Sequence, residues 1–374
     1  MAYAPTEEQE ILARTARELL GTQPVRRLRA LRDTHDPDGF SRALWSEMAR
    51  LGWLGIAVPE AYGGAGLGWR DLMVVLEELG RCLAPEPMLS MVAGTTALLL
   101  GGDEAQRRAH LPAVVAGERL LAVGYQEPGS RFDPTRVATR AERAADGWRL
   151  TGEKAHVLDG HVADWLVVSA RADEGITLFL VPRAAPGLGV ERLWRVDGRG
   201  AARLRLEGVR LDASAVLGEV GRGGELLGRV LDRATIALSA AMLGGMTAAF
   251  EMTLAYLKTR MQFGVLIGTF QALKHRAARM YVEIELARSV VTAAHAAIDD
   301  GADEAQVGRL GGAAKARCND AFLLVANEGV QMHGGIGMTD EHDIGLYLKR
   351  ARGDEMTFGD AAWQRDRLAQ LDGY

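Results

Sequence analysis

Cysteine is scarce in this chain. Only two cysteines occur among 374 residues, Cys82 and Cys318, and they lie far apart without the spacing of a metal-binding motif. A disulfide framework and a cysteine-based zinc site are therefore excluded. So little cysteine is typical of a protein that works in a reducing compartment, and we expect a cytoplasmic location.

The chain also lacks a strong charge of one sign and a long apolar run. Its net charge is −5, without the basic excess of a nucleic-acid-binding protein, so we expect no nucleic-acid partner. The first ten residues, MAYAPTEEQE, are acidic and unlike a signal peptide. No uninterrupted apolar run has membrane-spanning length, so we expect no membrane partner.

Proline is absent from the second half of the chain. All eleven prolines lie at or before Pro186, and the following 188 residues contain none. Because an internal proline breaks a helix, this absence favours long helices, which we expect at 224–260, 270–299, 304–333 and roughly 346–371, forming a four-helix bundle. Residues 1–120 also have a helical pattern, beginning after Thr6, a candidate N-cap before an acidic first turn.

The middle of the chain has a different pattern. Short alternating or β-branched segments, separated by Gly, Asp and Pro, occur at 121–125, 148–151, 165–169, 176–181 and 203–211. Strands without helices between them predict an antiparallel barrel or sandwich. The predicted fold class is α+β and mostly α: an N-terminal helical domain (1–120), a middle antiparallel β domain (121–222) and a C-terminal four-helix bundle (223–374).

One stretch after the first long helix combines a cation, an amide and an aromatic ring. Arg260, Gln262 and Phe263 come directly before Gly264, and Gln271 opens the next expected helix. Arginine binds phosphate oxygens bidentately, and a planar ring can stack on a base. Taken alone, the stretch is better explained as a turn between helices with a surface arginine.

A second stretch, from Gln331 to Glu341, is rich in glycine. Gly334, Gly335 and Gly337 lie within four residues, which lets backbone N–H groups approach a ligand closely. The two stretches together give R-x-x-F-G, then F-Q, then Q-x-x-G-G-x-G with a threonine and a glutamate after it. In this order the motifs resemble those of the acyl-CoA dehydrogenase family, and the likeness extends along almost the whole chain.

The resemblance implies a reaction and a cofactor. The reaction is α,β-desaturation of an acyl-CoA thioester, with FAD as the hydride acceptor and an electron-transfer flavoprotein as the next electron acceptor. In the family, the two motifs hold the pyrophosphate and adenosine of a flavin whose ring lies in the neighbouring subunit. Carried over to this chain, the cofactor-binding residues are Arg260, Gln262, Phe263, Gln271, Gln331, Gly334 and Gly335.

The family's catalytic positions are changed in this chain. Desaturation needs a carboxylate base near the substrate, and its two positions in the family correspond here to Phe358 and Ala234. Thr235 replaces an arginine that meets coenzyme A in many relatives. On the flavin-ring side, the loop at 126–130 is shorter by two residues, and 156–158 reads His-Val-Leu where the family has W-I-T. The catalytic residue is therefore unknown.

This asymmetry predicts one subunit of a heteromeric acyl-CoA dehydrogenase, paired with a second, glutamate-bearing chain. Some bacterial relatives that act on bulky sterol or ring-bearing thioesters are built that way. One alternative is a homomeric enzyme with a displaced base, for which Asp360 is the nearest carboxylate and Asp354 and Glu355 lie upstream. An oxidase or monooxygenase on the same scaffold and a non-catalytic structural subunit are further alternatives.

No metal site is expected. Glu341, His342 and Asp343 have the composition of a metal cluster, but three adjacent residues cannot all point at one ion in a helix. We interpret this triplet as a helix start. His333, between Met332 and Gly334, is expected to be structural.

Overall fold

The computed structural model describes residues 5–21 and 24–374. It divides into two compact units. Unit 1 comprises Met1–Asp33, Trp69–Ala84 and Thr235–Tyr374, and unit 2 comprises Thr34–Gly68 and Pro85–Ala234. The helix α7, Gly223–Thr259, runs from one unit into the other. The domain boundaries expected from the sequence stay a prediction. The compact units do not follow them, because residues 1–120 are divided between unit 1 and unit 2.

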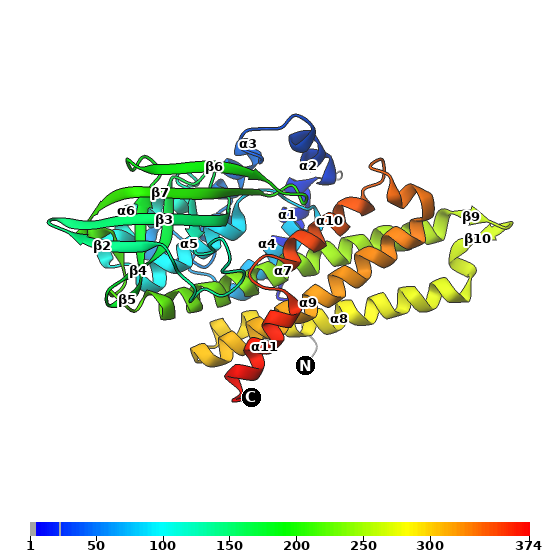
Figure 1. Cartoon of the computed structure of the whole chain (residues 1–374). Helices are drawn as coiled ribbons and strands as arrows, with labels where there is room; N and C mark the ends of the chain where they lie inside the picture. Colours follow the sequence, from blue (N-terminus) through cyan, green and yellow to red (C-terminus); the bar gives the residue numbers. More distant parts are fainter. Residues whose placement is uncertain (1–4, 22–23) are drawn as a thin grey trace. The chain divides into compact units, whose positions relative to one another are not determined.

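Unit 1 is helical (Figure 1). Besides most of α7 it contains α1 (Glu7–Leu20), α2 (Pro24–Asp33), α4 (Trp69–Arg81), α8 (Gln271–Asp299), α9 (Glu304–His333), α10 (Ile344–Glu355) and α11 (Ala361–Leu371). The predicted N-cap of α1 is confirmed. Thr6 accepts a hydrogen bond from the Gln9 backbone, and the Gln9 side chain accepts one from the Thr6 backbone, which satisfies two N–H groups at once.

The bundle departs from the sequence prediction at its fourth helix. A single helix over 346–371 is wrong, because the chain breaks between α10 and α11, where Phe358 and Gly359 have φ values of 58° and 105°. The buried ammonium of Lys315 in α9 stabilises this break. It donates to the carbonyls of Asp354 and Gly359 at 2.9 Å each, so two acceptors that the break exposes are satisfied.

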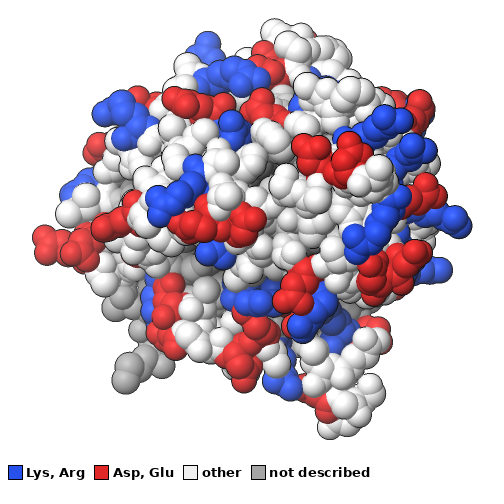
Figure 2. Space-filling view, turned by 90° about the vertical axis from the view of Figure 1, so that its left-hand side faces the viewer, with Lys and Arg blue, Asp and Glu red and all other residues white. Residues whose placement is uncertain are grey.

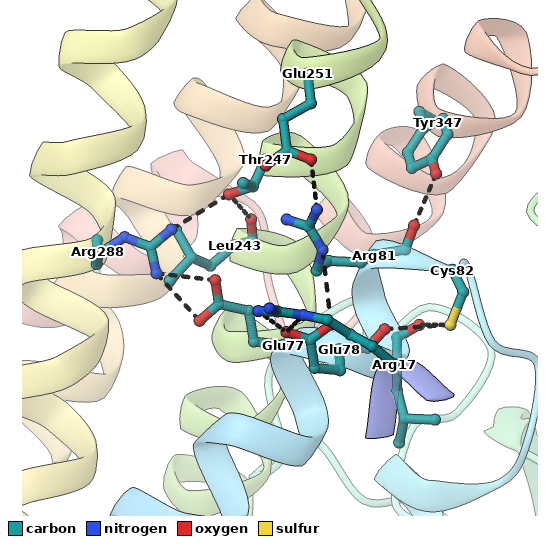
Figure 3. A network of polar contacts seen from close by, with 11 residues as sticks. Arg17, Glu77, Glu78, Arg81, Cys82, Leu243, Thr247, Glu251, Arg288 and Tyr347 are labelled. Atoms are coloured by element: carbon teal, nitrogen blue, oxygen red, sulfur yellow. Dashed lines mark hydrogen bonds and ion pairs between the residues drawn. The ribbon is translucent and has the colours of Figure 1, made fainter. Parts of the chain in front are cut away.

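Charged contacts join α4 to the bundle helices within unit 1 (Figure 3). Arg288 of α8 donates to both carboxylate oxygens of Glu77, at 2.8 and 3.1 Å. Arg17 of α1 donates through two nitrogens to Glu78, and Arg81 pairs with Glu251 of α7. Close helix packing accompanies these pairs, because a Cβ on Gly80 would lie 1.9 Å from the Ala241 carbonyl oxygen. Glycine is therefore required at this crossing.

Unit 2 is built on one mixed sheet. Its strands are β1 (Leu121–Gly124), β2 (Arg140–Ala144), β3 (Gly147–Leu158), β4 (Trp165–Ala172), β5 (Gly175–Pro182), β6 (Leu188–Trp194), β7 (Gly200–Asp212) and β8 (Val216–Leu217). The order is β6-β7-β3-β2-β4-β5-β8, and β1 pairs with β4. The helices α3 (Arg42–Arg50), α5 (Met88–Gly101) and α6 (Glu104–Val115) complete the unit.

The prediction of an antiparallel sheet needs correction at β4. Both β1 and β2 run parallel to β4, whereas the other five pairings of this sheet are antiparallel. Strand direction depends on which segments pair across long loops, and periodicity in the sequence does not report that. The five predicted strands are present. The strands β2, β6 and β8 were missed, because β2 is largely exposed, β6 has no buried residue and β8 has two residues.

Among the described residues, α7 alone is long and apolar enough to cross a membrane by length and composition. However, 78% of its most apolar 18-residue window is buried within the protein, as expected for a core helix. On the face shown in Figure 2, lysine and arginine are interspersed with aspartate and glutamate. No broad field of one sign covers that face.

Candidate functional site

The first predicted motif forms a projecting hairpin at one end of unit 1 (Figure 1). Arg260 follows α7, the short strands β9 (Met261–Gln262) and β10 (Val265–Leu266) pair in antiparallel fashion, and Gln271 begins α8. Phe263 lies at the tip with 90% of its surface exposed and φ of 55°. Such a conformation is an outlier for a bulky residue, so the chain holds an aromatic ring outward at a cost in backbone strain.

The second predicted motif forms a tight turn after α9. Gly334 has φ of 64° and ends the helix, and a short 3₁₀ helix (Gly334–Met338) follows. Their immediate chain neighbours apart, no atom of the described residues lies within 4 Å of where a Cβ on Gly334 or Gly335 would stand. Gln331 is exposed one turn earlier. The backbone of this turn is therefore open to solvent, as close approach of a ligand requires.

The two motifs, about 70 residues apart in the sequence, meet at the same end of the bundle. Tyr256 of α7, one helical turn before Arg260, has its ring centroid 4.5 Å from that of His333 in α9. His333 is buried, and its Nδ1–H donates to the Gly329 carbonyl at 2.7 Å, so its predicted structural role is confirmed. Tertiary packing thus brings Arg260 and Gln331 into one region of unit 1.

The polar side chains of this region are not used by the fold. Within residues 5–21 and 24–374, those of Arg260, Gln262, Gln271 and Gln331 make no hydrogen bond or ion pair, and all four are exposed. A guanidinium, three amides and an open glycine backbone suit an anionic dinucleotide, whose phosphates accept bidentate and backbone N–H donors. The residues present therefore fit the group that the sequence implied, and their individual roles remain a prediction.

The loop at 126–139 in unit 2 is held by a buried ion pair that the sequence did not reveal. Lys154 Nζ lies 2.6 Å from Glu127 Oε1 and donates to Ser169 Oγ at 3.0 Å. The same carboxylate accepts backbone N–H bonds from Ala138 and Thr139. Burial lowers the pKa of Lys154 to about 8, and Glu127 partly offsets this effect. Because every partner is satisfied, the shortened loop has a fixed shape.

Asp159, directly after the 156–158 segment, was also missed. It is buried with φ of 52°, accepts from the Ser90 hydroxyl, and donates its backbone N–H to Gly200 O at 3.0 Å. Burial raises the pKa of Asp159 to about 6, and the Ser90 hydrogen bond opposes that rise. His156 shares the left-handed conformation, with φ of 52°. No sequence signal could have found this buried acid, since burial there is decided by tertiary contacts.

Two of the three acids considered as a displaced base make structural contacts, and the third is buried. Asp360 caps α11, since its carboxylate accepts from the Trp363 N–H at 2.8 Å. Glu355 pairs with Arg352 at 3.0 Å, and Asp354 is buried at the end of α10. Phe358, which the sequence motif is expected to place at the family's first base position, is half-buried in the break between α10 and α11. These contacts therefore do not favour any of the three acids as the catalytic base of a homomeric enzyme.

The triplet before α10 is a helix start, as predicted. Asp343 is the N-cap residue of α10, and His342 Nδ1 accepts from the Ile344 N–H at 3.1 Å. Asp343 pairs with Arg29 of α2 at 2.8 Å. In the described parts of the chain, no group of three or more His, Cys, Asp or Glu side chains is placed to hold a metal ion.

The fold and the two motifs define a flavin-dependent dehydrogenase. Three domain models describe its parts: "Acyl-CoA dehydrogenase, N-terminal domain" matches residues 6–118, the middle domain 122–209 and the C-terminal domain 221–371. The chain belongs to the acyl-CoA dehydrogenase family, whose members are FAD-dependent oxidoreductases acting on CH–CH bonds.

Three relatives are informative. Mitochondrial isovaleryl-CoA dehydrogenase of Pongo abelii is 30% identical over 345 residues, covering 87% of this chain and 79% of that protein. A variant of the Tcur3481–Tcur3483 steroid ACAD has a TM-score of 0.88 and 38% identity, covering 98% of each chain. The ChsE4–ChsE5 complex from Mycobacterium tuberculosis has a TM-score of 0.88 and 28% identity, covering 100% of each chain.

Proposed function

We propose that this chain is one subunit of a heteromeric, FAD-dependent acyl-CoA dehydrogenase whose second subunit supplies the catalytic carboxylate. Bound FAD would supply the hydride acceptor for α,β-desaturation of an acyl-CoA thioester. In this proposal Arg260, Gln331 and the Gly334–Gly335 turn hold the dinucleotide tail of a flavin whose ring lies in the partner. An electron-transfer flavoprotein then receives the electrons.

One observation carries the proposal. The chain keeps a set of outward-facing donors that its own fold leaves unpaired, whereas its two candidate base positions hold Phe358 and Ala234. A set of donors that make no contact within their own subunit is best explained by a ligand shared with another subunit. Exposed apolar side chains surround this set, namely Met261, Phe263, Val265, Leu266, Ile336 and Met338. Exposed apolar area of this kind is typical of a protein–protein interface.

Two of the structural relatives support the heteromeric reading. The names ChsE4–ChsE5 and Tcur3481–Tcur3483 each join two different components, and the second is called a steroid ACAD. By analogy we propose a cytoplasmic enzyme of lipid or steroid metabolism that acts on a bulky, ring-bearing acyl-CoA.

The test compares the chain alone with the chain co-expressed with a glutamate-bearing relative encoded beside it. We expect the chain alone to be colourless or inactive, and the co-purified complex to contain fewer flavins than subunits. An Arg260→Ala variant should lower the flavin content of the complex, with Arg309→Ala as a control, since Arg309 pairs with Asp372 at the other end of α9. A yellow, active homo-oligomer made from the chain alone would rule the proposal out.

The same preparations separate the remaining alternatives. An oxidase or monooxygenase would show rapid reoxidation of the reduced flavin by air, which a dehydrogenase suppresses. A non-catalytic structural subunit would leave the flavin content unchanged in the Arg260→Ala complex. Each alternative thus has a result of its own.

A further inference from the structure

Three aromatic rings cluster next to the glycine turn. The His333 ring contacts that of Tyr256 at a centroid distance of 4.5 Å and that of His342 at 4.3 Å, both in tilted geometry, and the Tyr256 and His342 rings lie edge to face at 6.4 Å. The rings come from α7, from the end of α9 and from the segment before α10. Tyr256 is four residues before Arg260, and His333 is two residues after Gln331. The ring cluster therefore packs together the segments that carry the two halves of the proposed dinucleotide site.

The hydrogen bonds of the two histidines favour the neutral form of both rings. A carbonyl can only accept, so His333 Nδ1, bonded to Gly329 O at 2.7 Å, carries a proton. His342 Nδ1 accepts from the Ile344 N–H at 3.1 Å, so that nitrogen is unprotonated. His333 Nε2 is buried and has no partner in the described part of the chain. A second proton on His333 would thus lack an acceptor. A second proton on His342 would remove the acceptor of the Ile344 N–H at the start of α10.

The charged groups around the ring cluster have opposite effects on the protonation of His342. Arg29 from α2 approaches His342 and opposes its protonation, whereas Asp343 favours it. Asp340, in the same segment, is held by Arg29 and Arg32 of α2, and Lys349 of α10 lies 3.6 Å from it. The Tyr256 ring, from α7, contacts both histidine rings. Burial lowers the pKa of His342, and burial together with His342 lowers the pKa of His333.

We propose that His333 and His342 are positioning residues for the cofactor turn, and that protonating this pair loosens its hold on the dinucleotide. A proton on His342 Nδ1 removes the acceptor for the Ile344 N–H and places a cation beside Arg29 and against a second histidine. The turn at Gly334 and Gly335, attached directly to His333, then loses its support. FAD would be held firmly at neutral pH and released as the medium becomes acidic.

This inference rests on the proposed function for its ligand. The main experiment measures the rate of FAD release from the assembled complex, by the recovery of flavin fluorescence, at about pH 7.5 and about pH 5.5. We expect the rate to rise by about tenfold in the wild type. His342→Asn should remove most of this rise, because an asparagine oxygen still accepts the helix-start N–H but does not titrate.

The control is His35→Asn, which changes an exposed histidine of unit 2 and should keep the wild-type pH profile. Far-UV circular dichroism at both pH values checks that release is not unfolding. A His342→Asn complex that retains the full wild-type pH dependence would overturn the proposal. So would a wild-type release rate that does not change with pH.

A measurement without FAD keeps this inference distinct from the proposed function. The chain has eight histidines, so selective ¹³C-histidine labelling can follow each ring by NMR. We expect His333 and His342 to titrate below the ordinary value of about 6.5, with exchange of the Gly334 and Gly335 amides accelerating over the same range. If these signals titrate as expected while Arg260→Ala leaves the flavin content unchanged, the proposed function fails and the proton-sensitive turn stands. If both rings titrated at the ordinary value of about 6.5, the proposal of a proton-sensitive cofactor turn would be overturned.

Discussion

At the scale of single residues, we expect one buried histidine to make the stability of this protein sensitive to acid. His295 is fully buried in α8, its Nδ1–H donates to Val291 O at 2.8 Å, and burial lowers its pKa to about 4. Since the folded pKa is below the ordinary value of about 6.5, the unfolded chain binds more protons between these values. The unfolding free energy should therefore fall by roughly 2 kcal/mol between pH 7.5 and pH 5.

Urea unfolding at the two pH values measures this fall. His295→Asn should reduce it, because an amide can donate to Val291 without titrating, while His275→Asn, at an exposed position of the same helix, should not. Comparing each variant with itself across pH cancels any constant loss of stability. An undiminished fall in His295→Asn would assign the acid sensitivity to other groups.

Asp360 tests the displaced base at the same scale. Asparagine is as good an N-cap as aspartate but cannot take a proton, so Asp360→Asn separates the two roles. We expect Asp360→Asn to leave the activity of the assembled enzyme unchanged, and Asp360→Ala to lower the stability of the chain by about 1 kcal/mol. Loss of activity in Asp360→Asn, at unchanged stability and flavin content, would make Asp360 a base.

At the scale of elements, Lys315 decides where α10 ends. Its ammonium is 0% exposed and donates to Asn319 and to carbonyls at the break between α10 and α11. Lys315→Met should cost about 2–4 kcal/mol of unfolding free energy, because it leaves these buried acceptors unsatisfied. The measurement is urea unfolding together with trypsin cleavage at Arg352 and Arg365, which flank the break. Lys258→Met, at an exposed position, is the control.

At the scale of the whole molecule, we expect the hairpin β9–β10 to contribute to the proposed assembly with the second subunit. Phe263 contacts Phe270 at a centroid distance of 6.2 Å and is otherwise exposed, so the fold of the chain does not depend on it. Phe263→Ser should leave the urea midpoint of the isolated chain unchanged and reduce complex formation by about tenfold, as loss of a hot-spot aromatic does. Light scattering after gel filtration measures the assembled mass. Val196→Ser, an exposed apolar position in unit 2, should assemble normally.

Much of the fold followed from local patterns. The absence of proline after Pro186 predicted the long helices α7, α8 and α9 within a residue or two, because an uninterrupted helix needs every backbone donor. The break at Phe358 escaped prediction, because it contains no proline and is stabilised by Lys315, about 40 residues earlier in the sequence. Strand direction in unit 2 could not be predicted from the sequence either, because pairing across long loops leaves no periodic signal.

By itself, the sequence determined the family, the helical and strand segments, and the identities of the residues proposed to bind the cofactor. Those features depend on side-chain type and spacing, which are local. Only the tertiary structure decided that the rings of Tyr256, His333 and His342 pack together, that Lys154 and Lys315 are buried with satisfied partners, and that Arg260 and Gln331 lie at one end of the bundle. Burial and proximity arise when distant segments pack, and they set the protonation of a side chain that the sequence merely names.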